Sequence, residues 1–148
     1  MEIKEVLKNL REKNNLTQEQ LAEKVMVTRQ AVSRWETGET QPNTDTLMLL
    51  SKAFGVTINT LLGSPRQLVC QCCGMPLNED DMVSREQDGR FNEDYCKWCY
   101  AGGDFAYKTK DSLIDFLIGH MPNPENLPDE ERRKQYDMYL SQLKHWNE

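Results

Sequence analysis

The residues best suited to chemistry in this sequence are its five cysteines, which all lie between Cys70 and Cys99. Two pairs have C-x-x-C spacing, Cys70 with Cys73 and Cys96 with Cys99, and 22 residues separate the pairs. A turn of this spacing can aim two thiolates at one point, so two turns supply the four ligands of a tetrahedral zinc ion. The interval slightly exceeds the usual ~15–20 residues, which a longer hairpin would absorb. The pattern predicts a four-cysteine zinc site.

The segment between the two pairs indicates a structural role for this metal. It has few large aliphatic side chains and many acids: Glu79, Asp80, Asp81, Glu86, Asp88, Glu93 and Asp94. Such a segment cannot cohere by burial alone, and below ~40 residues a metal or disulfide is usually needed. Zinc binding is worth ~10–16 kcal/mol in small zinc units. Because four cysteines leave no open position for water or substrate, we expect one structural Zn²⁺ per chain and no catalysis.

The fifth cysteine, Cys72, lies outside both pairs and is interpreted as a spare thiol. Its position beside Cys73 keeps open a sensor, in which oxidation or metal loss changes the affinity for DNA. A thiol-redox enzyme is a further alternative, although neither pair has the helix-opening βαβ context of a thioredoxin-like site. We expect His120 and His145 to face solvent, since the cysteines already complete the metal shell.

A second candidate site is a predicted helix that begins after Thr28. At ~100° per residue, one arc of ~140° holds five polar side chains: Arg29, Gln30, Ser33, Arg34 and Thr37. No carboxylate lies among them in a protein of net charge -6. Arginine can bind guanine and glutamine can bind adenine through paired hydrogen bonds, each worth ~1–3 kcal/mol of discrimination. The face therefore favours DNA contact, while the plain alternative is a solvated helix surface. Trp35, on the opposite side, is expected in the core.

Five short helices are predicted to carry this face. The first helix is indicated by apolar residues at helical spacing from Ile3 onward. A capping box from Thr17 to Gln20 marks the start of the second helix. Thr28 and Thr57 are N-cap candidates for two later helices. Thr17 and Thr28 lie eleven residues apart, the close pairing that a helix-turn-helix requires.

These residues resemble a known family. The segments T-Q-E-Q-L-A at 17–22 and T-R-Q-A-V-S-R-W-E at 28–36, followed by Gly38, are similar to the Cro/C1-type (XRE) helix-turn-helix domain over residues 2–63. The resemblance implies that the third helix enters the major groove. It also implies a structural ion pair between Arg11 and Glu36, and Met26 stands where the family usually has glycine. The DNA-contacting residues it implies are Gln18, Thr28, Arg29, Gln30, Ser33 and Arg34.

The second half of the chain resembles a zinc-ribbon family. The resemblance rests on C-Q-C-C-G-M-P-L at 70–77, D-Y-C-K-W-C-Y at 94–100 and G-D-F at 103–105, and it extends weakly to Trp146. It implies that the metal ligands are Cys70, Cys73, Cys96 and Cys99.

The tail is predicted to contain two helices, residues 110–119 and a second that begins at 129. A stripe of Tyr136, Leu140, Leu143 and Trp146 favours packing on the zinc unit over a dimer surface. The basic run at 132–134 is expected to be solvated.

The expected fold is mainly α: a five-helix bundle at 1–63, a linker at 64–69, a four-cysteine ribbon at 70–105 and a helical tail at 106–148. Charge is divided unevenly, +1 over residues 1–66 and -7 over residues 67–148, so the acidic half is expected to point away from DNA or to contact a protein.

The sequence thus favours a DNA-binding transcription regulator acting as a homodimer on a near-palindromic operator of double-stranded DNA. An antitoxin-like or adaptor protein that binds a protein partner through its second half is the alternative. With no apolar stretch near the ~20 residues of a membrane span and no signal-peptide pattern, we expect a cytoplasmic protein. The sequence indicates neither the operator nor an effector pocket.

Overall fold

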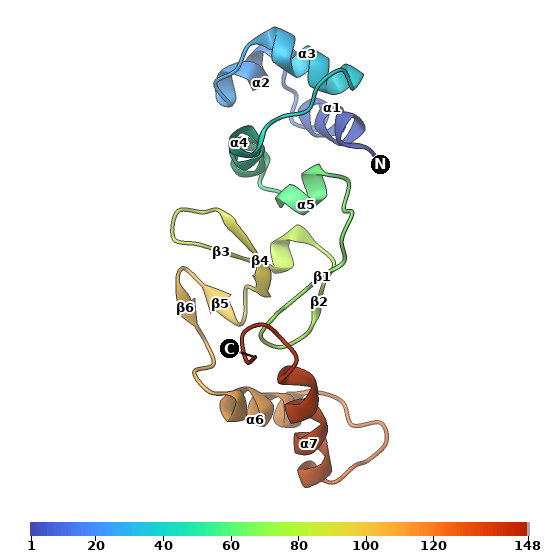
Figure 1. Cartoon of the computed structure of the whole chain (residues 1–148), viewed down its shortest axis with the longest axis vertical. Helices are drawn as coiled ribbons and strands as arrows, with labels where there is room; N and C mark the ends of the chain where they lie inside the picture. Colours follow the sequence, from blue (N-terminus) through green and yellow to red (C-terminus); the bar gives the residue numbers. More distant parts are fainter. Residues whose placement is uncertain (148) are drawn as a thin grey trace. The chain divides into compact units, whose positions relative to one another are not determined.

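The computed structural model describes residues 1–147, which form two compact units divided between Gln67 and Leu68 (Figure 1). The described residues contain seven α-helices and six short strands. None of these helices combines the length and the apolar character needed to cross a membrane.

The first unit is a bundle of five helices around one small core. The helices are α1 (Ile3–Lys13), α2 (Gln18–Lys24), α3 (Arg29–Thr37), α4 (Thr44–Phe54) and α5 (Ile58–Leu61). The buried apolar residues at its centre are Leu7, Leu21, Ala22, Val25, Val32, Trp35, Leu50 and Leu61. Trp35 is thus a core residue, as predicted, and every helix contributes to the same cluster or packs against it.

Capping residues set the ends of the two helices that matter most for the site. The backbone N–H of Gln20 donates to the Thr17 hydroxyl at 3.1 Å, and the Gln20 side chain accepts from the Thr17 N–H at 2.9 Å, so the predicted capping box is present. The Thr28 hydroxyl accepts from the Ala31 N–H at 3.1 Å and starts α3. Gly38 ends α3 in the left-handed conformation, with φ 83°.

The second unit combines three antiparallel hairpins with two helices. The strands are β1 (Leu68–Val69), β2 (Pro76–Leu77), β3 (Val83–Arg85), β4 (Phe91–Cys96), β5 (Tyr100–Ala101) and β6 (Asp104–Phe105), and a 3₁₀ turn, η1 (Asp80–Met82), precedes β3. They pair as β1–β2, β3–β4 and β5–β6, and the β3–β4 register shifts between Val83 and Ser84. The linker expected over 64–69 therefore meets β1 in its last two residues, of which Leu68 is buried.

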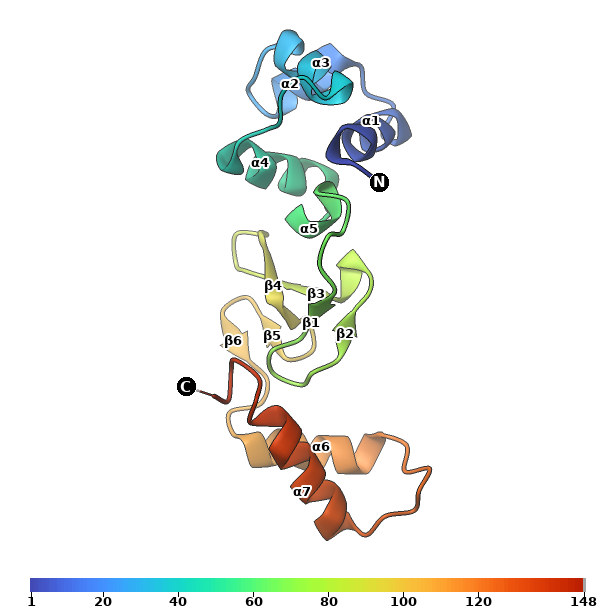
Figure 2. The same ribbon diagram turned by 45° about the vertical axis from the view of Figure 1, so that its right-hand side comes forward.

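Helices α6 (Lys110–His120) and α7 (Asp129–Leu140) contact each other side by side, as Figure 2 shows. Leu140 and Leu143 are buried in one cluster with four of the cysteines, and Tyr136 and Trp146 pack against it. The stripe on the tail is therefore core packing, as predicted. Helix α7 ends at Leu140, so Leu143 and Trp146 reach the core from the turns that follow it.

Two expectations about the tail were wrong. Arg132 is buried, not solvated: its guanidinium donates to the Ile118 and Met121 carbonyls at 3.1 and 3.2 Å and satisfies acceptors at the end of α6. His145, which was expected to face solvent, is half-buried, and its ring stacks on Phe105 with centroids 4.2 Å apart. His120 is exposed, and its ring stacks on Phe116.

Candidate nucleic-acid interface and metal centre

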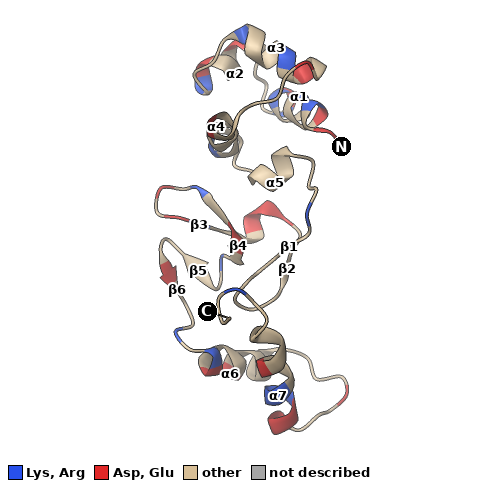
Figure 3. Ribbon diagram, viewed as in Figure 1, with Lys and Arg blue, Asp and Glu red and all other residues tan. Residues whose placement is uncertain are grey.

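The structure places most of the residues proposed to contact DNA on the outer face of α3. Thr28, Arg29, Gln30 and Arg34 are exposed, and Ser33 is half-buried. Figure 3 shows basic segments on α3, whose first turn contains no acidic residue. The Thr28 hydroxyl serves as the N-cap acceptor, and a hydroxyl in that role still has its proton to donate.

The sixth residue, Gln18, lies on the neighbouring helix. It is the first residue of α2 and is half-buried. Helices α2 and α3 pack against each other, so the start of α2 is held beside the face of α3. A backbone N–H at a helix start can bind a phosphate oxygen, which agrees with the DNA contact that the resemblance implied for Gln18.

The turn between α2 and α3 contains a residue in an unfavourable conformation. Met26 has φ 57°, in the left-handed region, and its side chain is 78% exposed. The following N–H, of Val27, donates to the Ala22 carbonyl at 2.9 Å and closes the turn. Met26 therefore takes the backbone shape that glycine adopts without cost, and its exposed side chain gains little burial in return.

A largely buried ion pair connects α1 to α3. Arg11 Nε and Nη2 donate to Glu36 Oε2 and Oε1 at 2.8 and 2.9 Å, and Arg11 Nη1 donates to the Leu16 carbonyl at 2.9 Å. The side chains are only 13% and 5% exposed. The hydrogen bond to Glu36 raises the pKa of Arg11. The ion pair that the resemblance implied is present, and it fixes α3 against α1.

Four cysteine sulfurs converge in the second unit. Cys70 and Cys73 lie in the turn between β1 and β2, while Cys96 ends β4 and Cys99 precedes β5. The four sulfurs all lie within 4.8 Å of one another. A backbone hydrogen bond closes the first of these turns: the Gly74 N–H donates to the Cys70 carbonyl at 2.9 Å.

The dimensions of this cluster suit a tetrahedral metal. The distance between Cys73 Sγ and Cys96 Sγ is 3.9 Å, and a tetrahedron with Zn–S of ~2.3 Å has sulfurs about 3.8 Å apart. The N–H groups of Cys72 and Cys73 donate to Cys70 Sγ at 3.4 and 3.5 Å, and such bonds favour the thiolate. The residues present therefore fit a zinc ion.

Ionisation within the cluster gives a second reason to expect a cation. The hydrogen bond from Cys73 lowers the pKa of Cys70. The hydrogen bond to Cys70 is the largest cause that raises the pKa of Cys73, and also the largest that raises the pKa of Cys99. The Cys70 thiolate thus opposes the ionisation of Cys73 and of Cys99. A bound divalent cation removes this opposition, because it attracts every thiolate at once.

Cys72 is not part of the four-sulfur group. It is a spare thiol, as interpreted from the sequence, and its side chain is fully buried. Its backbone carbonyl accepts from Trp146 Nε1 at 2.7 Å. Burial of this thiol removes the exposure that a reactive cysteine needs.

Sequence reasoning missed the contacts between the tail and the first cysteine turn. The backbone N–H of His145 donates to the Gln71 carbonyl at 3.1 Å, and that of Lys144 donates to Gln71 Oε1 at 3.1 Å. Together with the Trp146 bond to Cys72, these contacts join residues 144–146 to the turn that presents Cys70 and Cys73. No local pattern indicates such a pairing, since it spans more than 70 residues.

In comparisons with known proteins, the two units of the chain match different families. Residues 7–61 match a family model described as "Helix-turn-helix". A segment of 62 residues is 53% identical to the "HTH-type transcriptional activator BcrR" of Enterococcus faecalis, covering 42% of this chain and 30% of that protein. The match thus spans less than a third of the relative's length.

One solved structure resembles a similar share of the chain. It is the P22 c2 repressor protein in complex with synthetic operator 9T in the presence of Tl⁺, with a TM-score of 0.42 and 34% identity over 43% of this chain and 97% of that one.

The second part of the chain matches along almost its whole length. Residues 69–147 fit the family model described as "Putative zinc ribbon domain", and this range contains all five cysteines and both tail helices. The match covers more than half of the chain, which therefore belongs to this zinc-ribbon family and carries an XRE-type helix-turn-helix domain at its N-terminal side.

Proposed function

We propose that the chain is a sequence-specific DNA-binding transcription regulator whose helix α3 reads the major groove, and that it is not an enzyme. The observation that carries this proposal is the exposed face of α3. Arg29, Gln30 and Arg34 are exposed there on a helix-turn-helix domain, and the domain's relative is named a transcriptional activator. Arginine and glutamine are the side chains that bind guanine and adenine edges with paired hydrogen bonds.

The neighbouring groups would position this face on the duplex. Gln18 and the first N–H groups of α2 are suited to a phosphate, which fixes register without reading sequence. Arg34 lies 4.0 Å from Glu39, and both side chains are more than half exposed. Because an exposed pair of this length is worth at most ~1 kcal/mol, Arg34 can exchange Glu39 for DNA at little cost.

A single domain of this size would bind weakly, so the proposal includes a homodimer. One small module buries too little surface for tight specific binding. Two copies would contact half-sites ~34 Å apart, or a multiple of this spacing, on a near-palindromic operator.

The second unit would hold one structural zinc ion through Cys70, Cys73, Cys96 and Cys99. The geometry of the four sulfurs supports this ligand set, and a closed shell of four cysteines belongs to structural sites. The ion would join the β1–β2 turn to the β4–β5 turn, and its binding energy would stabilise a unit with many acidic residues.

Selection from a random duplex DNA library with the zinc-loaded full chain tests the regulator proposal. The expected result is an enriched motif with two symmetric half-sites about 10 base pairs, or a multiple of this, apart. The regulator proposal would be contradicted if the protein bound all library sequences equally or if no sequence were enriched. Metal analysis of the same sample tests the zinc proposal separately, because the expected content is one zinc ion per chain.

A further inference from the structure

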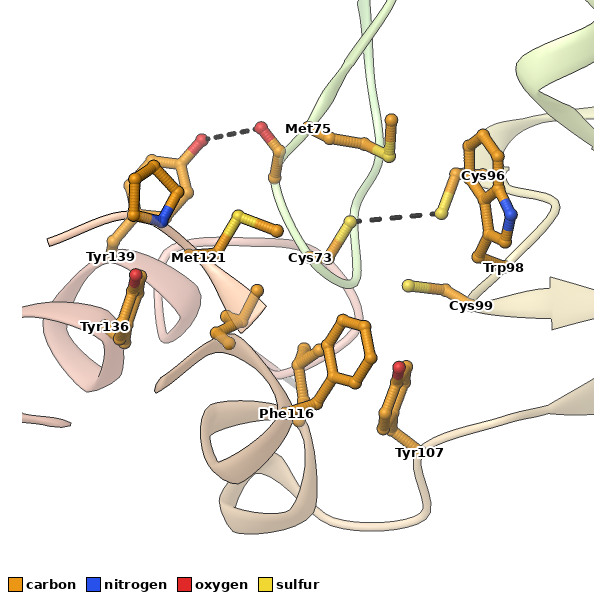
Figure 4. Close-up of a pocket in the computed structure, with 14 residues that line it drawn as sticks. Cys73, Met75, Cys96, Trp98, Cys99, Tyr107, Phe116, Met121, Tyr136 and Tyr139 are labelled. Carbon is orange, nitrogen blue, oxygen red and sulfur yellow. Dashed lines mark hydrogen bonds between the residues drawn. The ribbon is translucent and has the colours of Figure 1, made fainter. Parts of the chain in front are cut away.

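A cavity of about 870 Å³ lies beside the four-cysteine cluster, within the second unit. In Figure 4, Cys73, Cys96 and Cys99 lie on one side of it, while Phe116 and Tyr107 lie below them. Its volume falls within the ~300–1,000 Å³ of small-molecule sites. It is thus a concave site of ligand size rather than a flat contact surface.

Aromatic and apolar side chains dominate the walls. Five lining residues are aromatic: Trp98, Tyr107, Phe116, Tyr136 and Tyr139. Among residues 1–147, no lysine, arginine, histidine, aspartate or glutamate lines the cavity. Trp98 is 54% exposed, Phe116 39% and Met121 44%, so large apolar side chains remain in contact with water at this site. The unit's own folding does not cover them.

The metal cluster gives this apolar site a negative electrostatic potential. Four thiolates around one Zn²⁺ leave a net charge of -2, and three of the four sulfur ligands line the cavity. The faces of aromatic rings also attract cations, since their quadrupole is negative there. One positive charge lies nearby, on Lys97, whose Nζ is 5.0 Å from the Trp98 ring centroid, but Lys97 is not among the described residues that line the cavity. The site therefore combines a large apolar area with attraction for positive charge.

We infer that this cavity binds a lipophilic organic cation, an aromatic or quaternary ammonium-type molecule, against the aromatic rings and the thiolate wall; the inference rests on the zinc ion proposed above. An anion of the same size would meet the same apolar walls but would be repelled by the cluster. For two ligands of equal size and apolar area, the sign of the charge therefore determines which one binds more tightly.

Two contacts show that the site is built rather than accidental. The Tyr139 hydroxyl donates to the Gly74 carbonyl at 3.2 Å and ties α7 to the first cysteine turn. Gly74 has φ 81°, and a Cβ there would lie 2.2 Å from Tyr139 Cε1; glycine is what lets this wall approach so closely.

The inference can be tested with two probe ions of matched size and shape, tetraphenylphosphonium and tetraphenylborate. Binding of each to the zinc-loaded full chain is measured by isothermal titration calorimetry. We expect saturable binding of one phosphonium ion per chain, at least roughly tenfold tighter than the borate, a difference equivalent to ~1.4 kcal/mol. Equal affinity for both ions, tighter binding of the borate or binding of neither would overturn the inference.

Substitutions locate the site. Trp98→Leu keeps an apolar side chain but removes the ring, and should weaken phosphonium binding roughly fivefold or more. Met121→Ala should also weaken it, whereas Met138→Ala is the matched control, because Met138 is 70% exposed on α7 and does not line the cavity. Equal effects of the two methionine substitutions would place the ion elsewhere and contradict the assignment.

Metal analysis and analytical ultracentrifugation separate the other outcomes. A zinc content well below one per chain would refute the zinc proposal, whereas a fully loaded protein that does not prefer the cation refutes only the ligand inference. If phosphonium binding dissociates a dimer, a second copy of the chain occupies the cavity, and the small-molecule assignment is wrong.

Discussion

Arg11 and Glu36 are 25 residues apart in the chain and are joined by two parallel hydrogen bonds between guanidinium and carboxylate. The pair links α1 to the C-terminal half of α3, and both side chains are largely buried. Paired N–H···O bonds fix both distance and direction. The position of α3 therefore depends on a contact made inside the first unit.

Removing one member of this pair should be costly. Arg11→Ala leaves the Glu36 carboxylate buried without its partner, so we expect a loss of roughly 3–5 kcal/mol in the unfolding free energy of the first unit. The double substitution Arg11→Met with Glu36→Leu should recover most of it, since no buried charge remains. Chemical denaturation monitored by hydrogen exchange in α1 and α3 measures both. A double variant as unstable as the single one would show that the charge was not the cause.

Met26→Gly should stabilise the first unit, by about 1 kcal/mol. The substitution relieves a left-handed φ at a position whose side chain is largely exposed, and that relief outweighs the greater flexibility of glycine in the unfolded chain. Lys8→Gly is the matched control: Lys8 is exposed and lies in the middle of α1, so its replacement should destabilise by about 1 kcal/mol. Opposite signs in thermal unfolding are expected, and equal signs would refute the strain argument.

Arg29→Ala should relax specificity at one base position of each half-site and cost ~1–3 kcal/mol of binding free energy. Lys52→Ala, on the exposed surface of α4, should leave the sequence preference unchanged. Competition binding on a panel of single-base operator variants measures the effect. If Arg29→Ala weakens all sequences equally, Arg29 contacts a phosphate and the base assignment is incorrect.

Loss of the metal should unfold the second unit and spare the first. Cys99→Ser removes a ligand and should abolish stoichiometric zinc, with hydrogen exchange becoming fast in residues 68–147 while α1 to α5 stay protected. Cys72→Ser is the control, because Cys72 lies outside the four-sulfur group, and it should retain one zinc ion per chain. Loss of zinc in both variants alike would mean that the ligand set is wrong.

The features predictable from sequence were those encoded within a few residues. The Thr17 capping box, the cap at Thr28 and the two C-x-x-C turns each depend on spacings of three residues, and Trp35 follows from helical periodicity. The burial of Arg132 and the stacking of His145 were not predictable, because their partners lie on other elements. The cavity was hidden for the same reason: its walls come from the two cysteine turns and from α6 and α7.

The attachment of residues 144–146 to the Gln71–Cys72 turn has a consequence for the order of events during protein synthesis. The first cysteine turn emerges from the ribosome long before the segment that donates hydrogen bonds to it. The first unit, Met1–Gln67, forms its own core from residues that are synthesised earlier, so it can fold while translation continues. The second unit reaches its full set of contacts on the first cysteine turn only after residue 146 has been added.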